Sequence, residues 1–527
     1  MKNILLLFIY GAFPFIFIGQ ISQIDVQKYY IDIRVSDLND LIYVEEKINF
    51  NLNDVAAPIV LNLEQKNQNG KGMEVTKLLV EGKSCSFKQQ NDSLYIYHTS
   101  MYNKSHQIPI TVEIQYQGIP SSGLIIGKNK YGDRVFFGDN WPNRAQRWIA
   151  CNDHPTDKAL VDFTVHAPSK YQVIANGKQI KETEEKEMRT HYYSSKTPIP
   201  TKVMVIGIAQ MYIKNYPSAI PVSAWVYPKN KEDGFTDFSL APDILLFYQN
   251  LFGAYEYEQM ANVQSTTEFG GMENAGCIFY NETSITGTKS CENLIAHEMV
   301  HQWFGNSASE KNWCDLWLSE GFATYFTNYY ILKTKGETSF KSALDKDRKA
   351  IIRFNKIYTH PVVDTSYASL MDLLNTNSYQ RGGWILHMLS KKLGEEAFLK
   401  SIRAYYLKYR LSNASTQDFI SVIQAENPNI EWTTFFKQWL YNPKIPVLAI
   451  QENKNKNTVQ IKVSQEQGGV PFEITLSILV RLEDGSEKLE RLQINSRAFK
   501  FDKTYDQNIK DILYDPNIEL LFETVMR

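Results

Sequence analysis

Cysteine is scarce in this chain, and its spacing argues against a cysteine-based metal site. The 527 residues include five cysteines, and none of them forms a C-x-x-C pair. This pattern excludes a cysteine zinc ribbon. One disulfide is possible if the protein is exported, without a favoured pairing, and small buried thiols are the alternative. The cysteines are Cys85, Cys151, Cys277, Cys291 and Cys314.

The chain also lacks a strong net charge. Its formal net charge is -2 at pH 7, and no run of lysine and arginine alternates with aromatic residues. Nucleic acid and anionic surfaces attract proteins through an excess of positive charge. We therefore expect no nucleic-acid partner.

Long apolar runs are absent after the amino terminus. There, Lys2 precedes an apolar stretch from Ile4 to Gly19 that contains Pro14. The stretch is shorter than the ~20 residues of a spanning helix, and its basic start is typical of a secretory signal. We predict a signal peptide over residues 1–19, a periplasmic or secreted location and no stable membrane insertion after its removal. An uncleaved anchor is the alternative.

Three regions differ in hydrophobic period, and the chain is too long for a single core. Residues 20–221 alternate with a period of two, as in Tyr29–Val35, which predicts a β-domain. Residues 222–444 contain helical stripes such as Leu240–Phe252. The period of two returns over residues 445–527, which predicts a small β-sandwich-like domain. The expected fold class is α+β and multidomain.

Two local signals in the first region concern hairpins. Asn176-Gly177 follows the strand-like segment Tyr171–Ile174, and Asn-Gly is a strong signal for a two-residue hairpin turn. The charged stretch Lys181–Glu187 is expected to form the solvated tip of a hairpin rather than a partner site.

The segment His297-Glu298-Met299-Val300-His301 carries the first chemical signal. Four residues of α-helix advance by ~400°, so the two imidazoles lie ~40° apart on one face. Both rings can then reach one zinc ion, and Glu298 can flank the metal without binding it. Glu292 suits the first turn of this helix. A helix with two structural histidines is the alternative if this motif stands alone.

A catalytic zinc ion needs a third protein ligand. Glu320 follows His301 after eighteen intervening residues, in the helix-like segment Asp315–Ala323. Two neutral imidazoles and one carboxylate leave an open coordination position that suits hydrolysis. We predict one Zn²⁺ per chain, bound by His297, His301 and Glu320. Asp315 is a candidate acceptor for a histidine N–H, and an exposed charge is the alternative.

Together these motifs resemble the zinc site of the gluzincin aminopeptidases, the family of aminopeptidase N and leukotriene hydrolase. The segment Gly270-Gly271-Met272-Glu273-Asn274 resembles the substrate-binding G-x-M-E-N motif of that family. Trp303–Asn306 and Trp317–Ala323 also resemble family blocks. The resemblance runs from the first strands to the C-terminal β-domain, and it implies a thermolysin-like zinc domain over residues 222–444.

The resemblance implies a role for each matching residue. Glu273 would bind the α-ammonium group of the substrate, and the backbone of Gly270 and Gly271 would pair with the extended peptide, since glycine permits close approach. Glu298 would act as general base, and Tyr379 would donate to the oxyanion. The implied function is a zinc-dependent aminopeptidase whose partners are peptides with a free amino terminus.

The sequence departs from the family pattern in three places. Trp141 stands where the family often has a Gln or Glu that gives a second ammonium contact, which leaves Asp139 or Asn140 as substitutes. Arg381 replaces the lysine that follows the family tyrosine. The chain ends after the small β-domain, without room for the large helical domain of many relatives, so we expect a more open cleft.

Three other functions remain open. A zinc endopeptidase would use the same chemistry, although Glu273 argues against it. An epoxide hydrolase is possible because leukotriene hydrolase shares the Gly-Gly-Met-Glu-Asn motif. A non-catalytic peptide-binding scaffold predicts loss of the ligands or the base, and all of them are present.

Overall fold

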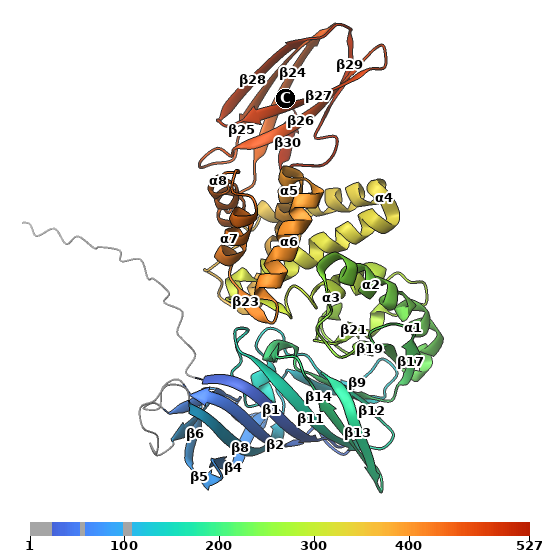
Figure 1. The fold of residues 1–527 in the computed structure, drawn as a ribbon, viewed down its shortest axis with the longest axis vertical. Helices are drawn as coiled ribbons and strands as arrows, with labels where there is room; N and C mark the ends of the chain where they lie inside the picture. Colours follow the sequence, from blue (N-terminus) through green and yellow to red (C-terminus); the bar gives the residue numbers. More distant parts are fainter. Residues whose placement is uncertain (1–23, 53–57, 98–107, 527) are drawn as a thin grey trace, which may run out of the picture.

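The computed structural model describes residues 24–52, 58–97 and 108–526. The predicted signal peptide, residues 1–19, lies outside this range. Among the helices of the described residues, none combines the length and the apolar character needed to cross a membrane. A β-domain, a helix-rich part and a second β-domain follow one another along the long axis of the molecule (Figure 1). The predicted α+β multidomain fold is confirmed, whereas the predicted domain limits stay predictions.

The N-terminal β-domain is built on a large sheet in the order β13-β14-β11-β1-β2-β8-β4-β5, with β15 paired to β11. Buried and exposed side chains alternate along its central strands, so one face packs on the core and the other faces solvent. The strands are β1 (Ile24–Arg34), β2 (Ile42–Leu52), β4 (Gly72–Val80), β5 (Lys83–Ser84), β8 (Ile108–Ile119), β11 (Lys158–Pro168), β13 (Lys178–Glu185), β14 (Met188–Ser194) and β15 (Ile199–Pro200).

Smaller sheets complete this domain. One has the order β12-β16-β10-β9 and another the order β3-β7-β6. Their strands are β9 (Leu124–Lys128), β10 (Arg134–Gly138), β12 (Gln172–Ala175), β16 (Ile206–Ala209), β3 (Ile59–Asn62), β6 (Ser86–Gln90) and β7 (Ser93–Tyr97).

The hairpin predicted at Asn176-Gly177 is wrong. β12 and β13 flank this pair but belong to different sheets, so the chain crosses between sheets here. An asparagine stands at position 176 for a different reason, which is the hydrogen bonding of its buried side chain. Its Nδ2 donates to the carbonyls of Val203 and Ala275, both at 2.8 Å. The hairpin instead joins β13 to β14, and Lys181–Glu187 forms its exposed tip as predicted.

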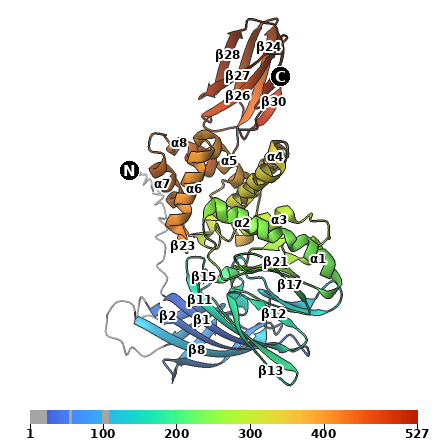
Figure 2. The same ribbon diagram turned by 45° about the vertical axis from the view of Figure 1, so that its right-hand side comes forward.

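The helix-rich part begins with a sheet in the order β17-β18-β19-β21-β20. In both ribbon views this sheet lies between the N-terminal strands and helices α1 to α3 (Figures 1 and 2). The strands are β17 (Tyr212–Tyr216), β18 (Val222–Val226), β19 (Met260–Ser265), β20 (Gly271–Met272) and β21 (Cys277–Asn281). The helices are α1 (Lys231–Asp237), α2 (Ala241–Phe252), α3 (Glu292–Val300), α4 (Trp317–Asn355), α5 (Gly382–Leu393), α6 (Glu395–Tyr409), α7 (Thr416–Glu426) and α8 (Thr433–Phe436).

The C-terminal domain contains a sheet in the order β28-β25-β24-β30 and a second in the order β27-β26-β29. Ile461 and Ile478, one from each sheet, are fully buried, as expected for the inner faces of a sandwich. The strands are β24 (Val447–Asn455), β25 (Thr458–Gln465), β26 (Ile474–Leu482), β27 (Glu487–Ile494), β28 (Ala498–Thr504), β29 (Ile509–Tyr514) and β30 (Glu523–Met526). All five cysteines lie in the described part of the chain as free thiols.

Candidate active site

Helix α3 brings the two motif histidines together as the helical spacing predicts. Its apolar face, which includes Ile295 and Met299, is fully buried. Glu292 occupies the first turn, where its carboxylate pairs with Lys335 at 2.7 Å. The Nε2 atoms of His297 and His301 lie 3.3 Å apart, so both rings are directed at one point.

Glu320, near the start of α4, completes this convergence. Its Oε2 lies 3.5 Å from His297 Nε2 and 3.4 Å from His301 Nε2. The three side chains form a group whose ligand atoms all lie within 4.8 Å of one another. Glu320 Oε2 is buried and accepts no hydrogen bond from the described residues. Two ring nitrogens and an unsatisfied carboxylate oxygen fit one divalent cation, and this N/N/O set suits zinc.

The charges around His297, His301 and Glu320 also favour a cation between these three side chains. Burial opposes a charge on His301, but the neighbouring carboxylates, with Glu320 foremost, raise its pKa to about 10. The Glu320 carboxyl is also desolvated, yet the two histidines hold its pKa well below the usual range. A positive charge at the centre of the group is therefore strongly stabilised.

Ser319 and the chain after α3 orient His301. The Nδ1 atom of His301 lies 3.0 Å from Ser319 Oγ and 3.2 Å from the carbonyl oxygen of Phe304. The prediction that Asp315 accepts a histidine N–H is wrong, because its Oδ1 accepts from the backbone N and Oγ1 of Thr416 at 2.9 and 2.7 Å. Asp315 thus ties the start of α4 to the start of α7. No sequence pattern points to Ser319 except its place directly before Glu320, the candidate third ligand.

Glu298 lies between the histidine pair and strand β20. It is buried, and desolvation raises the pKa of its carboxyl well above the usual range. A Cβ atom on Gly271 would overlap the Glu298 carboxylate, so only glycine lets the strand pass this close. β20 is the last strand of its sheet and pairs with β21 alone. The base candidate therefore stands beside a free strand edge.

Glu273 directly follows β20. Hydrogen bonds hold its backbone carbonyl in place, whereas one oxygen of its carboxylate has no such partner within the described part of the chain. Its carbonyl oxygen accepts from Gln302 Nε2 at 2.9 Å and from Asn306 Nδ2 at 2.6 Å. Its Oε1 is buried without a hydrogen-bond partner among the described residues. A buried acceptor left unpaired is costly, so this oxygen is poised to receive a ligand donor.

Two lysines of the N-terminal domain, the buried Lys202 and the half-buried Lys158, support the same region. Lys202 forms a 2.5 Å ion pair with Glu310, and both side chains are buried. The Nζ of Lys158 donates to the carbonyl oxygen of Asn306 at 2.7 Å, and Asn306 in turn donates to Glu273. No sequence pattern predicts this support, because the lysines lie more than 100 positions before their partners.

Tyr379 lines the same cavity beside His297. Its ring stacks on that of His297, with centroids 6.1 Å apart and an interplanar angle of 11°. Burial, followed by the charges of Glu320, Glu273 and Glu298, raises the pKa of Tyr379 well above its usual value. The phenol therefore stays protonated and can donate.

A cavity of about 350 Å³ joins these groups. It contains all of the predicted site residues except Asn274, which is fully buried and does not line it. The lining residues are Trp141, Phe269, Gly270, Gly271, Met272, Glu273, Leu294, His297, Glu298, His301, Glu320, Leu374 and Tyr379.

Comparison with known proteins identifies the family. Residues 26–203 match the family model described as the peptidase M1 N-terminal domain, and residues 237–439 match the peptidase family M1 domain. The chain belongs to peptidase family M1. The second match includes the histidine pair, Glu320 and Tyr379.

Curated members of family M1 resemble much of the chain. A probable aminopeptidase 2 of Sulfurisphaera tokodaii is 26% identical over 414 residues, which are 75% of this chain and 52% of the relative. A leucyl aminopeptidase of Saccharolobus solfataricus is 23% identical over 484 residues, 85% of this chain and 61% of the relative. The alanine/arginine aminopeptidase of Saccharomyces cerevisiae is 26% identical over 385 residues, which are 69% of this chain and 45% of the relative. The chain thus spans about half the length of these family M1 relatives.

The segment around Trp141 departs from the family M1 pattern. Trp141 lines the cavity, whereas Asp139 pairs with Arg144 at 2.7 Å and Asn140 donates to the carbonyls of Thr201 and Met204. The expectation that Asp139 or Asn140 replaces the family Gln or Glu is therefore wrong. Both side chains are fully buried and hold the segment in place instead.

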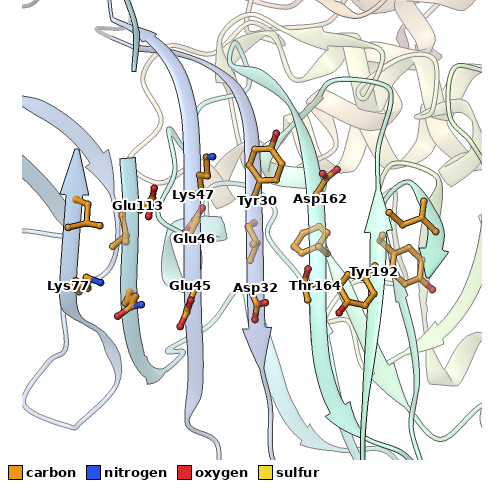
Figure 3. A pocket seen from close by; sticks show the side chains of 17 residues that line it. Tyr30, Asp32, Glu45, Glu46, Lys47, Lys77, Glu113, Asp162, Thr164 and Tyr192 are labelled. Carbon is orange, nitrogen blue, oxygen red and sulfur yellow. The ribbon is translucent and has the colours of Figure 1, made fainter. Parts of the chain in front are cut away.

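A second cavity, of about 440 Å³, lies on the open face of the large N-terminal sheet (Figure 3). Tyr30, Lys47 and Glu113 are register partners on adjacent strands there, and opposite charges directly across strands attract. Asp162 pairs with Lys28 at 2.7 Å. This cavity contains none of the predicted site residues, and we interpret it as the solvated face of the sheet.

Proposed function

We propose that this member of family M1 is a zinc-dependent aminopeptidase that removes the first residue of peptides with a free amino group. The observation that carries the proposal is the unpaired, buried carboxylate of Glu273 in the same cavity as the histidine–glutamate group and Glu298. A hydrolytic centre needs no such fixed anion, but recognition of an α-ammonium group does.

The free edge of β20 supports the binding mode. An extended peptide can add to an exposed strand edge through main-chain hydrogen bonds. Gly271 allows the backbone to lie against Glu298, and Glu273 follows two residues later. A charge-assisted hydrogen bond from the ammonium group to Glu273 would then set which peptide bond lies over the metal ligands.

The proposed reaction is hydrolysis of that first peptide bond. Zinc, when bound by His297, His301 and Glu320, supplies Lewis-acid polarisation and lowers the pKa of water. Glu298 accepts the proton of the attacking water and transfers it to the leaving amine as the C–N bond breaks. The Tyr379 hydroxyl donates to the carbonyl oxygen, where negative charge develops.

A peptide and its acetylated twin test the amino-end requirement. We expect release of the first residue from the free peptide and almost none from the acetylated form. Glu273→Ala should lower kcat/KM for the free form and narrow the gap between the two, because a buried charge-paired partner contributes about 2–5 kcal/mol. Equal cleavage of the acetylated peptide, or cleavage at internal bonds, would favour an endopeptidase instead.

We also propose that the protein is exported through the signal at residues 1–19. Sequencing the amino terminus of the protein from its own cells, together with cell fractionation, tests this. Retention of the signal in the membrane fraction would favour the anchor alternative.

A further inference from the structure

The cavity wall contributed by the N-terminal domain is aromatic. Trp141 is only 3% exposed, and its ring packs nearly perpendicular to Phe269 and to Trp313, with centroids 6.1 Å away in both cases. Such edge-to-face contacts fix the orientation of the indole. Trp141 thereby connects the N-terminal domain to the segments before β20 and before α4.

This wall lies on the Glu273 side of the cavity. Phe269 directly precedes the Gly270–Asn274 motif, and Met272 belongs to it. The neighbouring Asp139 accepts from the Thr267 hydroxyl at 3.0 Å and from the Glu268 backbone N–H at 3.1 Å, which clamps the segment of Trp141 to this approach. If the ammonium group of a substrate binds Glu273, the first side chain of that substrate would lie beside the aromatic wall. The wall consists of Trp141, Phe269 and Met272.

No charged group in the cavity is left to pair with a charged first side chain. Each charged or titratable lining residue has a role in the proposed reaction; these residues are Glu273, His297, Glu298, His301, Glu320 and Tyr379. The other apolar lining residues are Leu294 and Leu374. Asp139 and Asn140, which directly precede Trp141, are occupied by their own buried partners. Arg144, whose guanidinium lies over the Phe269 ring, is paired with Asp139 and Glu268.

We propose that this site selects peptides whose first residue is large and apolar, and that Trp141 is a specificity-determining residue for that choice. The inference rests on the proposed aminopeptidase function and names its substrate class. An apolar side chain gains by leaving water for this wall. The wall offers one unpaired polar atom among the described residues, the Trp141 Nε1–H, which carries no charge. An acidic or basic side chain would therefore lose hydration without a compensating opposite charge.

A panel of single-residue amides tests the selectivity with the zinc-loaded full chain. We expect kcat/KM for leucine and phenylalanine amides to exceed that for alanine, glutamate and lysine amides by about tenfold or more, the effect of a few methylene groups in an apolar pocket. Equal rates across the panel, or a clear preference for glutamate or lysine, would overturn the inference.

Variants at the wall assign the preference to Trp141. Trp141→Gln introduces an amide and should reduce the ratio of leucine to alanine kcat/KM at least several-fold, while Trp141→Phe should retain most of it. Phe269→Ala, at a partly exposed position, should reduce the same ratio if Trp141→Gln does not fold. If the ratio of leucine to alanine kcat/KM is unchanged in the folded variants, Trp141 does not determine the specificity.

A binding measurement separates failure of the inference from failure of the proposed function. Free leucine, phenylalanine, glutamate and lysine are titrated calorimetrically into the full chain under the same buffer conditions. If no amide is hydrolysed, the aminopeptidase proposal fails, while tighter binding of leucine and phenylalanine still supports the apolar subsite. If amides are hydrolysed but glutamate or lysine binds as tightly as leucine, the selectivity inference fails alone.

Discussion

Gly271 and Glu298 are in such close contact that a methyl group on Gly271 would overlap the Glu298 carboxylate. The glycine therefore determines where the base candidate can stand. We predict that Gly271→Ala keeps its zinc but loses about 10²-fold in kcat, since a displacement near 1 Å can have this effect. Gly270→Ala is the matched control, because a Cβ there meets only Leu294 at 3.8 Å. Equal losses in both variants would contradict the steric explanation.

Removing one histidine should release the metal. We predict that His301→Ala loses nearly all of its zinc, because two ligands do not hold a catalytic ion as three do. Metal analysis of the purified variant measures this. His154→Ala is the control, since this histidine contacts Thr156 in a turn and lies outside the metal group. Full zinc retention by His301→Ala would refute the ligand assignment.

Glu298→Gln should separate metal binding from turnover. The substitution keeps the shape of the side chain but removes its ability to take a proton. We expect normal zinc content and a loss of ~10²–10⁴-fold in kcat. Glu292→Gln, on the same helix but outside the cavity, should remain active. Turnover of Glu298→Gln at the parent rate would exclude Glu298 as the base.

Tyr379→Phe should affect the transition state more than substrate binding. A hydroxyl that donates to the developing oxyanion contributes mainly to kcat, so we expect a fall of ~10²–10³-fold with KM nearly unchanged. Steady-state kinetics with an amide substrate measures both constants. A fall of only about twofold, with the variant folded and zinc-loaded, would make Tyr379 a packing residue.

A buried acid far from the active site should make stability depend on pH. Burial raises the pKa of Glu46 to about 8, although Tyr116 and the Ala150 N–H donate to its carboxylate and oppose the shift. The folded protein thus keeps a proton that the unfolded chain releases above its ordinary pKa of about 4.3. The stability contributed by this group is fully present below that value and is lost as the pH rises to about 8.

Glu46→Gln measures this contribution. The neutral amide cannot ionise, so we expect the free energy of unfolding to fall less between pH 5 and pH 8 than in the parent, by about 3–4 kcal/mol. Denaturant titrations at both pH values measure the difference. Glu45→Gln changes the adjacent exposed carboxylate and should leave the pH dependence as it was. The same pH slope in Glu46→Gln and the parent would refute the assignment.

The sequence predicted those parts of the site that depend on local spacing. His297 and His301 share a helix face by geometry alone, and the motif around Glu273 is contiguous. Lys158 and Lys202 support the site through tertiary packing across domains, which no local pattern records. Their contributions could only be located in the folded structure.

Two of the wrong predictions have a common physical cause. Asn176-Gly177 has the local preference for a tight turn, but the buried Asn176 amide holds distant carbonyls and the flanking strands join different sheets. Asp315 lies close in sequence to the candidate metal ligands, but its carboxylate accepts hydrogen bonds from the backbone N–H and the hydroxyl of Thr416 instead. In both cases long-range hydrogen bonds outweigh the local signal.

Arg381, two residues after Tyr379, has a consequence for the integrity of the enzyme. Its fully buried guanidinium donates to the carbonyl oxygens of Asn442 and Lys444, at 2.6 and 3.0 Å, where the chain leaves the helices for the C-terminal sandwich. Arg381 therefore connects this junction to the segment that carries Tyr379. We expect a protease cut at this junction to remove the acceptors of a buried cation and thereby to weaken the support of Tyr379, two residues away.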